Sequence, residues 1–482
     1  MAILTIDQGT TGTTVLLIDK AGEIIAKAYR EFEQIYPNPG WVEHDPQEIW
    51  KTVEDCVEEV LSSYTGSIDA LGITNQRETT VLWDETTGKP VYNAIVWQCR
   101  RTSGICEDLE PHGKLIKAKT GLPLDAYFSG TKAKWILENA IFPDHAELKF
   151  GTIDTWLIWK LTNGMVHATD HTNASRTMLY NIHERAWDPD LCKLMNLPME
   201  ILPTVKHSAD NYGTVSSISA LSGVPIHGVI GDQQASLYGQ QCFSPGEIKN
   251  TYGTGCFIMM NTGDKAVDSS KGLITTIAAA PDGSPCYALE GSVFIAGAAM
   301  QWLRDELGVI ETAADSEAAA TAVENNGGVY FVPAFVGLGA PYWNMDARGL
   351  ITGLTRGSNK NHLIRAGLES MAYQTHDVIQ TMLEETGLDI QSVAVDGGAT
   401  ANEFLLQFQA DILGMNIDRA YRIETTALGA AYLAGLKKGI WTGEDLKQFA
   451  RQKTRFGPEM PTAERQHLLS GWKSAIRKVL DS

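Results

Sequence analysis

Apolar residues near the N-terminus fall into two short runs separated by a turn rich in Gly and Thr. Ile3, Leu4 and Ile6 form the first run, and residues 15–18 form the second. Two β-type runs joined by such a turn predict a β-hairpin. A second hairpin of the same kind is predicted at residues 248–260. Two similar hairpins about half a chain apart suggest two domains built on one plan.

Segments with helical spacing alternate with short apolar runs along the rest of the chain. In residues 46–64, apolar side chains such as Ile49, Val53 and Val57 recur every three or four positions, which predicts a helix. The other predicted helices are residues 131–139, 155–161, 296–307, 363–385, 402–413 and 427–438. The other predicted strands are residues 70–74, 91–97, 329–333 and 393–396. This alternation predicts a mixed α/β protein.

The chain length changes this picture by requiring more than one core. With 482 residues, the chain exceeds the size of one ordinary domain, so two domains are expected. The pattern breaks at Ser244, Pro245 and Gly246, just before the second hairpin. We therefore predict an N-terminal domain over residues 1–244 and a C-terminal domain over residues 245–482.

Charge and composition narrow the choice of partners. The formal net charge is −19, from 39 Lys and Arg against 58 Asp and Glu, which disfavours nucleic acid and anionic membrane surfaces. A nucleotide is not disfavoured, because backbone N–H groups, helix N-termini and Mg²⁺ can hold phosphates. No signal peptide and no apolar run long enough for stable membrane insertion is recognised. Seven irregularly spaced cysteines without a C-x-x-C motif indicate free thiols and a cytoplasmic location.

The turn of the first hairpin carries residues suited to a nucleotide bound with magnesium. Asp7 is followed by Gln, Gly and Thr residues, and the segment is not a Walker A loop. Gly allows close approach of the backbone to phosphate, Thr hydroxyls donate hydrogen bonds, and a carboxylate binds Mg²⁺. Thr254 and Gly255 of the second hairpin would supply donors from the opposite side. The alternative is an ordinary hairpin in which Asp7 accepts from turn amides.

Two further segments are candidates for chemistry. Asp232 follows an apolar run that ends at Gly231, and phosphoryl transfer to an alcohol needs a carboxylate that accepts the hydroxyl proton. The alternative, compatible with the first, is that Asp232 caps the helix that follows. Gly397 and Gly398 lie between a predicted strand and a predicted helix, where a flat ring could approach the backbone. The alternative there is a tight strand-to-helix connection.

Motifs along almost the whole chain resemble those of the FGGY carbohydrate kinases. The matching segments are residues 6–11 (Ile-Asp-Gln-Gly-Thr-Thr), 72–80, 93–102, 127–132, 172–178, 231–235, 250–257, 340–343, 396–399 and 424–431. Each match is weak alone, but their order makes the resemblance specific. It implies a two-domain α/β fold of the actin/sugar-kinase/Hsp70 type (ribonuclease H-like), with an interdomain cleft that closes on ATP and substrate.

Within that family, the chain is most similar to members that phosphorylate glycerol to sn-glycerol 3-phosphate with ATP and Mg²⁺. The resemblance assigns polyol contacts to Arg77, Glu78, Trp97, Tyr127, Asp232, Gln233 and Phe257. It assigns nucleotide contacts to Thr10, Thr11, Gly12, Thr254, Gly297, Gln301, Gly398 and Asn402. It makes Asp232 the catalytic base and Asp7 with Asp232 the metal-binding carboxylates. A homodimer or homotetramer is also implied.

The sequence departs from the family pattern in ways that leave alternatives open. Thr14 stands where many relatives have an Arg that meets the nucleotide phosphates, which bears on nucleotide affinity, rate or donor identity. Residues 216–224 lack the Lys and Arg of relatives inhibited by fructose 1,6-bisphosphate, so no such inhibition is expected. The alternatives are a kinase of another small polyol or ketose (erythritol, dihydroxyacetone or xylulose) and a non-catalytic nucleotide sensor on the same fold.

Overall fold

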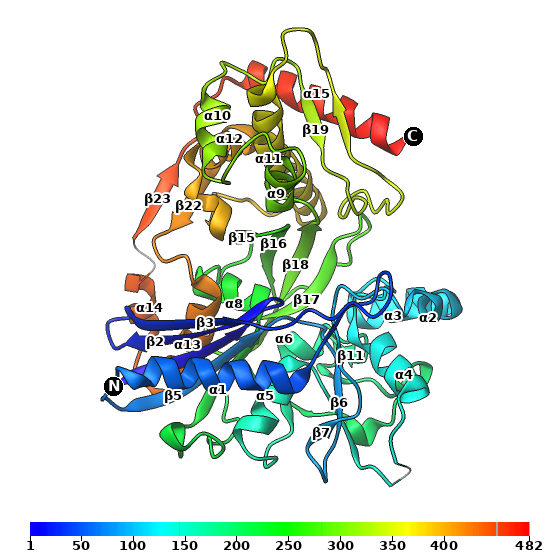
Figure 1. Cartoon of the computed structure of the whole chain (residues 1–482), viewed down its shortest axis with the longest axis vertical. Helices are drawn as coiled ribbons and strands as arrows, with labels where there is room; N and C mark the ends of the chain where they lie inside the picture. Colours follow the sequence, from blue (N-terminus) through cyan, green and yellow to red (C-terminus); the bar gives the residue numbers. More distant parts are fainter. Residues whose placement is uncertain (144, 281, 450–451, 482) are drawn as a thin grey trace.

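Two mixed β-sheets organise the protein, and helices cover the faces of both (Figure 1). The computed structural model describes residues 1–143, 145–280, 282–449 and 452–481. Strand and helix segments alternate along the chain. The mixed α/β class predicted from the sequence is confirmed.

The first sheet has five strands in the order β14-β5-β1-β2-β3. Its strands are β1 (Ala2–Gln8), β2 (Gly12–Asp19), β3 (Ile24–Glu31), β5 (Ile68–Asn75) and β14 (Ile226–Gly231). β1, β2 and β3 form an antiparallel meander, whereas β5 and β14 run parallel to β1. The hairpin predicted at the N-terminus is therefore confirmed.

The second sheet has seven strands in the order β17-β18-β16-β15-β21-β22-β23. Its strands are β15 (Ile248–Tyr252), β16 (Cys256–Gly263), β17 (Ile274–Ala279), β18 (Pro285–Val293), β21 (Ser392–Asp396), β22 (Asn416–Ala420) and β23 (Lys453–Phe456). β15, β16 and β18 pair antiparallel in that order, β17 pairs antiparallel with β18 at the edge, and β21 and β22 continue the sheet in parallel. This central plan repeats the strand order and directions of the first sheet, and the second predicted hairpin is confirmed.

Side-chain alternation in β1 and β2 directs apolar residues to two different helices. Leu4 and Ile6 share a core with α1 (Pro46–Ser62), which begins after Asp45 caps its first turn. Ile3 packs on the opposite face with α13 (Thr425–Lys438). A strand presents successive side chains to opposite faces, so both faces of this sheet are buried.

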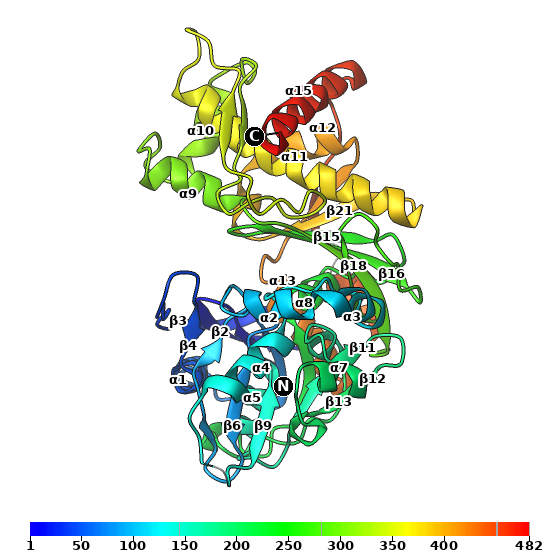
Figure 2. The same cartoon turned by 90° about the vertical axis from the view of Figure 1, so that its right-hand side faces the viewer.

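Helices also cover the second sheet (Figure 2). The longest is α11, which starts at a capping box formed by Asn359 and His362 and ends where Gly387 adopts a left-handed conformation. The helices of this part are α9 (Gly297–Asp305), α10 (Asp315–Thr321), α11 (Lys360–Thr386), α12 (Glu403–Leu413) and α15 (Thr462–Leu480). The helices α9, α10, α11 and α12 share an apolar core with β15, β16 and β18, and α15 packs in a neighbouring core with α11 and α12.

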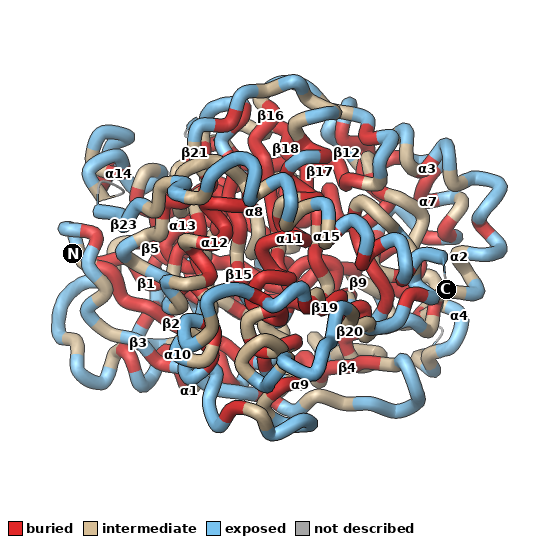
Figure 3. The backbone as a smooth tube through the Cα atoms, turned by 90° about the horizontal axis from the view of Figure 1, so that it is seen from above, coloured by how far each residue is buried: buried red, intermediate tan, exposed pale blue. Residues whose placement is uncertain are grey.

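Two helices cross closely between the sheets. α8 (Asp232–Gly239) follows β14, and α13 packs against α8 and against β1, β5 and β14. A Cβ on Gly429 of α13 would lie 2.0 Å from the carbonyl oxygen of Ala235, so only Gly allows this approach. Figure 3 shows the buried backbone running through the centre of the molecule along α8, α13, β15 and α11.

The remaining elements are short and mostly surround the first sheet. The helices are α2 (Ser103–Leu109), α3 (Gly113–Thr120), α4 (Ser129–Asn139), α5 (Ile153–Leu161), α6 (His171–Ala174), α7 (Pro189–Leu194) and α14 (Gly443–Phe449). The strands are β4 (Glu43–His44), β6 (Val81–Asp84), β7 (Lys89–Pro90), β8 (Ala94–Ile95), β9 (Leu148–Gly151), β10 (Ala168–Asp170), β11 (Tyr180–Asn181), β12 (Ala186–Trp187), β13 (Thr204–Lys206), β19 (Tyr330–Val332) and β20 (Leu350–Thr352). None of the helices in the described residues has the length and apolarity to cross a bilayer.

Most predicted elements are confirmed to within a few residues, and one strand prediction is wrong. The segment 91–97 is a strand only at Ala94–Ile95, which pairs with β4. Its apolar side chains instead join a separate core with α3 and α4, so their burial did not require a long strand. The domain boundary after residue 244 stays a prediction, because α13 belongs to the later half of the chain yet packs on the first sheet.

Candidate active site

Most of the predicted site residues lie where strands of the two sheets end. Asp7 lies near the end of β1, Asp232 opens α8 directly after β14, and Thr254 lies in the turn between β15 and β16. In open α/β sheets, ligands bind beyond the carboxyl ends of strands, where loops and helix N-termini gather. The two sheets thus direct their strand ends toward one candidate site.

Asp232 occupies a junction that holds its carboxylate in place. Gly231, not Asp232, is the cap residue of α8, so the predicted capping role is wrong by one position. The Gly231 N–H donates to Thr172 Oγ1 over 2.9 Å, and the Gln233 N–H donates to Asp232 Oδ1 over 2.6 Å. Burial raises the pKa of Asp232, and the nearby Arg77 opposes the rise.

Asp7 lies in a part of the site where burial and nearby carboxylates disfavour its charged form. Burial first, and then the charges of Asp232 and Glu424, raise its pKa to about 8, while Lys27 lowers it. Two carboxylates that repel each other in a buried site favour a bound cation. Across the described ranges, no cluster of three or more His, Cys, Asp or Glu side chains is placed to hold a metal. Asp7 and Asp232 fit Mg²⁺ as a pair that phosphate or water oxygens would complete.

An aromatic wall stands beside these carboxylates. The ring of Trp97 lies edge-on to Tyr127, with centroids 5.5 Å apart, and to Phe257, with centroids 6.4 Å apart. Trp97 Nε1 donates to Thr10 Oγ1 over 2.9 Å. The wall therefore joins the predicted polyol residues to the phosphate turn of the first hairpin, and Phe257 brings in the second sheet.

Arg77 and Glu78 take part in a buried ion network. Arg77 Nε lies 3.1 Å from Asp232 Oδ1, and Arg77 Nη1 lies 2.6 Å from Glu290 Oε2. Arg176 Nε donates to Glu78 Oε1 over 2.5 Å. Glu290 was not predicted as a site residue, and Arg176 lies in a segment that resembles the family but had no predicted role. The ordering of these charges is visible only in three dimensions.

Glu78 holds a backbone conformation that is uncommon for residues other than Gly. Its φ is 61°, in the left-handed region. Its carbonyl oxygen accepts from Ser129 Oγ and from Thr80 Oγ1, each over 2.9 Å. Burial raises the pKa of Glu78, while Arg176 and Arg77 lower it. The conformation is thus supported from α4 as well as locally.

Gln233 faces a lysine that was likewise not predicted as a site residue. The ammonium group of Lys249, on β15, donates to Gln233 Oε1 and to Thr251 Oγ1. Burial lowers the pKa of Lys249 to about 8, although Asp396 raises it. A buried lysine next to Asp232 and Gln233 adds a positive charge from the second sheet to the site.

The predicted nucleotide residues divide between ordered turns and exposed positions. The N–H of Gly297 donates to the carbonyl of Gly253, and the N–H of Ala298 donates to that of Thr254, which seats α9 on the second turn. Asn402 caps α12 by accepting from the Leu405 N–H over 2.9 Å.

The exposed members of the nucleotide set are Thr11, Thr254, Gln301 and Gly398. In the described part of the chain, no side-chain hydrogen bond connects any of these four with another residue of the set. On the first hairpin, a Cβ on Gly12 would lie 2.6 Å from the Tyr29 ring, so β3 packs tightly behind this turn. Thr14, on β2, pairs with Asp7 on β1 and with Tyr29 on β3.

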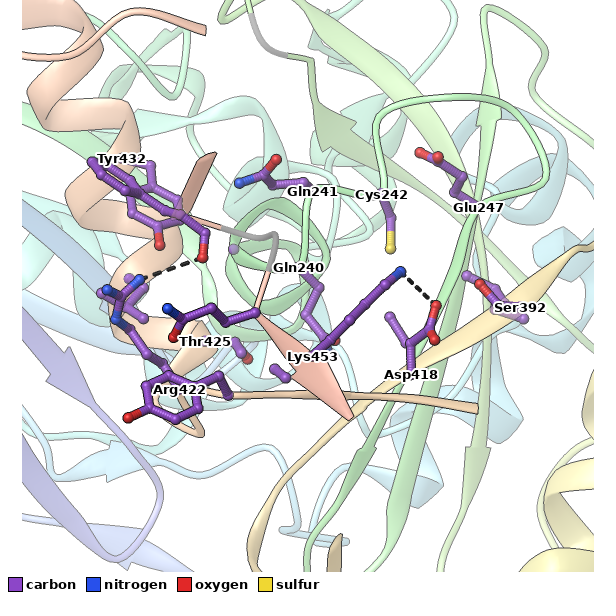
Figure 4. Close-up of a pocket in the computed structure, with 18 residues that line it drawn as sticks. Gln240, Gln241, Cys242, Glu247, Ser392, Asp418, Arg422, Thr425, Tyr432 and Lys453 are labelled. Atoms are coloured by element: carbon purple, nitrogen blue, oxygen red, sulfur yellow. Dashed lines mark hydrogen bonds and ion pairs between the residues drawn. The ribbon is translucent and has the colours of Figure 1, made fainter. Parts of the chain in front are cut away.

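A separate cavity of about 270 Å³ lies on the α8–α13 side, between α13, α14 and β21–β23 (Figure 4). Lys453 Nζ lies 2.6 Å from Asp418 Oδ2 in it, and Arg422 donates to the Phe449 carbonyl. Among the described residues that line this cavity, none belongs to the predicted site. It is therefore distinct from the candidate active site.

Comparisons with known proteins agree along nearly the whole chain. The family models for the N-terminal and C-terminal domains of the FGGY family of carbohydrate kinases match residues 2–239 and 248–437. The glycerol kinase of Desulfitobacterium hafniense is 55% identical over 491 residues, covering 99% of each chain.

Solved structures give the same result. The structure of Plasmodium falciparum glycerol kinase with ADP has a TM-score of 0.93 at 38% identity and covers 99% of this chain and 98% of that one. A xylulose kinase structure from Lactobacillus acidophilus has a TM-score of 0.90 at 24% identity, covering 100% and 98%, and shows the shared fold. The resemblance and the two-domain fold inferred from the sequence are confirmed: the chain belongs to the FGGY family of carbohydrate kinases.

Proposed function

We propose that the protein transfers the γ-phosphoryl group of ATP to a terminal hydroxyl of glycerol, which yields sn-glycerol 3-phosphate. The observation that carries the proposal is the identity of 55% over the whole chain with a relative named glycerol kinase. The arrangement of Asp232, Arg77 and the aromatic wall around one site supports it.

Asp232 is the proposed base. Its carboxylate would accept the proton of the attacking hydroxyl, while Arg77, 3.1 Å away, keeps the carboxylate oriented. Glu78 would accept from a second hydroxyl, and Gln233 and Arg77 would hydrogen-bond the glycerol oxygens. Trp97, Tyr127 and Phe257 would pack the carbon skeleton and exclude water, which competes with glycerol for the phosphoryl group.

Nucleotide contacts are assigned to both hairpins. Thr10, Thr11, Gly12 and Thr254 would bind phosphates, and Gly297, Gln301, Gly398 and Asn402 would contact the rest of the nucleotide. The relative from Plasmodium falciparum was solved with ADP, which supports nucleotide use here. Asp7 and Asp232 would hold Mg²⁺, which neutralises developing charge on the phosphates when bound. The raised pKa of Asp7 supports that pairing.

The aromatic residues around the acceptor site disfavour five-carbon sugars. Trp97 contacts both Tyr127 and Phe257, which leaves little width for a five-carbon ketose. A non-catalytic sensor would have little use for both Asp7 and Asp232. We place the reaction in a reducing cytoplasm, because all seven cysteines are free thiols. A homodimer or homotetramer stays a prediction that light scattering would test.

The test is formation of glycerol 3-phosphate from MgATP and glycerol by the wild type and by Asp232→Asn. Rapid product formation that falls by at least about a thousandfold in the variant is expected, because the proton acceptor is lost. A panel of glycerol, erythritol, dihydroxyacetone and xylulose should show the highest kcat/KM for glycerol. ATP binding without product from any of the four would instead support the sensor.

A further inference from the structure

Glu290 is a fully buried carboxylate that the proposed reaction does not use directly. It lies on β18 of the second sheet, and its side chain is 0% exposed. Both terminal nitrogens of Arg77 donate to it, Nη1 to Oε2 over 2.6 Å and Nη2 to Oε1 over 3.0 Å. Arg176 Nη2 donates to the same Oε1 over 3.1 Å. One carboxylate from the second sheet thus holds two arginines that come from the first half of the chain.

These groups close into a ring of alternating charge. Arg176 reaches from Glu290 to Glu78 through its Nε, 2.5 Å from Glu78 Oε1. Arg77 Nε lies 3.9 Å from that same Glu78 oxygen. The four side chains are at most 2% exposed and their formal charges sum to zero. Buried charges are tolerated in such a balanced arrangement, and removing one partner leaves another uncompensated.

The ring determines where the polyol-side groups point. A guanidinium group is rigid and planar, so hydrogen bonds to its two terminal nitrogens fix the direction of its Nε–H. For Arg77 that direction leads to Asp232 Oδ1. For Arg176, Glu290 holds one terminal nitrogen, Nη2, while Nε donates to Glu78. The proposed base and the proposed hydroxyl acceptor are therefore both oriented through one residue.

We infer that Glu290 is a positioning residue for the acceptor site. It holds Arg77 and Arg176 so that Asp232 and Glu78 face the polyol. Because Glu290 comes from the second sheet and both arginines come from the first half of the chain, the acceptor site is complete only when the two parts meet as they do here. The inference rests on the proposed function and adds a residue that contacts no reacting atom.

The charge state of Glu290 is consistent with this role. Burial alone would raise its pKa, but Arg176 and Arg77 lower it to about 2. The carboxylate therefore stays ionised throughout the working range. Glu290→Gln removes the charge with almost no change in shape, whereas Glu290→Asp keeps the charge and shortens the reach by one methylene.

The experiment compares Glu290→Gln, Glu290→Asp and a control by steady-state kinetics and thermal unfolding. The control is Glu369→Gln, which removes another buried carboxylate paired with an arginine, Arg365, in α11. Glu290→Gln should raise the KM for glycerol and lower kcat, with kcat/KM reduced about 10- to 100-fold, while the KM for MgATP changes less than about twofold. Glu290→Asp should recover part of the loss. Glu369→Gln should lose stability but keep the wild-type KM for glycerol.

The outcomes distinguish a failure of the positioning role of Glu290 from a failure of the proposed glycerol phosphorylation. An active wild type with unchanged glycerol kinetics in a folded Glu290→Gln overturns the positioning role alone. A wild type that phosphorylates no glycerol overturns the proposed function and, with it, this inference. If Glu290→Gln does not fold, Arg176→Lys decides, since it keeps the charge but cannot bridge Glu78 and Glu290. A raised KM for glycerol supports the role, and wild-type kinetics overturn it.

Discussion

Replacing Asp7 by Asn should lower the activity and should raise the stability of the ligand-free protein. The pKa of Asp7 rises from its ordinary 3.8 to about 8, chiefly through burial and through the neighbouring Asp232 and Glu424. Between these two values the folded protein keeps a proton on Asp7, whereas the unfolded chain has released it. The wild type therefore loses stability as pH rises through this window, and Asp7→Asn lacks that loss.

The magnitude follows from linkage. One extra proton bound by the folded state lowers the free energy of unfolding by about 1.4 kcal/mol per pH unit. From pH 5 to pH 7, the difference between Asp7→Asn and the wild type should therefore grow by about 2.7 kcal/mol in favour of the variant.

Urea unfolding of both proteins at pH 5, 6 and 7, without nucleotide or Mg²⁺, measures this difference. The same proteins are assayed for glycerol phosphorylation, where Asp7→Asn should lose at least about a hundredfold in kcat because the metal-binding pair is broken. A stability difference that does not change with pH would refute the reasoning, since it would mean that Asp7 is already ionised in the folded protein.

Asp154→Asn is the matched control. Asp154 is also buried, accepts from Thr152 and Thr169, and has a pKa raised to about 7 by burial and by Asp170. Its removal should give a pH-dependent stability difference of the same sign. Because Asp154 has no proposed contact with metal or substrate, kcat should stay near the wild-type value. Loss of activity in both variants would point to a general effect of buried carboxylates rather than to a metal site.

Three further outcomes are expected. Gly429→Ala should destabilise the protein by about 1–3 kcal/mol, because its Cβ would meet a backbone carbonyl. Gly104→Ala, which has open space around its Cβ, should leave the stability unchanged or raise it by up to about 1 kcal/mol. Equal urea midpoints for the two variants would contradict this expectation. Trp97→Phe should lower kcat/KM about three- to tenfold by removing the hydrogen bond to Thr10, and unchanged steady-state kinetics would show that this bond is dispensable. Fructose 1,6-bisphosphate at millimolar concentration should not reduce the rate, and a dose-dependent loss would show a binding site that residues 216–224 do not reveal.

Local patterns in the sequence were sufficient to predict most of the secondary structure. The helix at Pro46–Ser62 and both hairpins follow from apolar spacing and from turns of Gly and Thr, which act over a few residues. The strand predicted at residues 91–97 was wrong because a short apolar run signals burial without saying which partner provides it. Asp7 and Asp232 could be selected as candidates because each lies at the end of an apolar run.

Tertiary structure alone decided how those candidates are connected. Arg77 and Glu290 lie 213 positions apart, and a single Glu within an apolar strand has no local feature that identifies its partner. The same holds for Arg176 and for Lys249, whose roles depend on charges brought from both sheets. The need for Gly at position 429 is likewise absent from the local sequence, because it arises only from the close approach of α8. Periodicity reports which side of an element is buried, whereas close approach and charge pairing depend on how the elements meet in space.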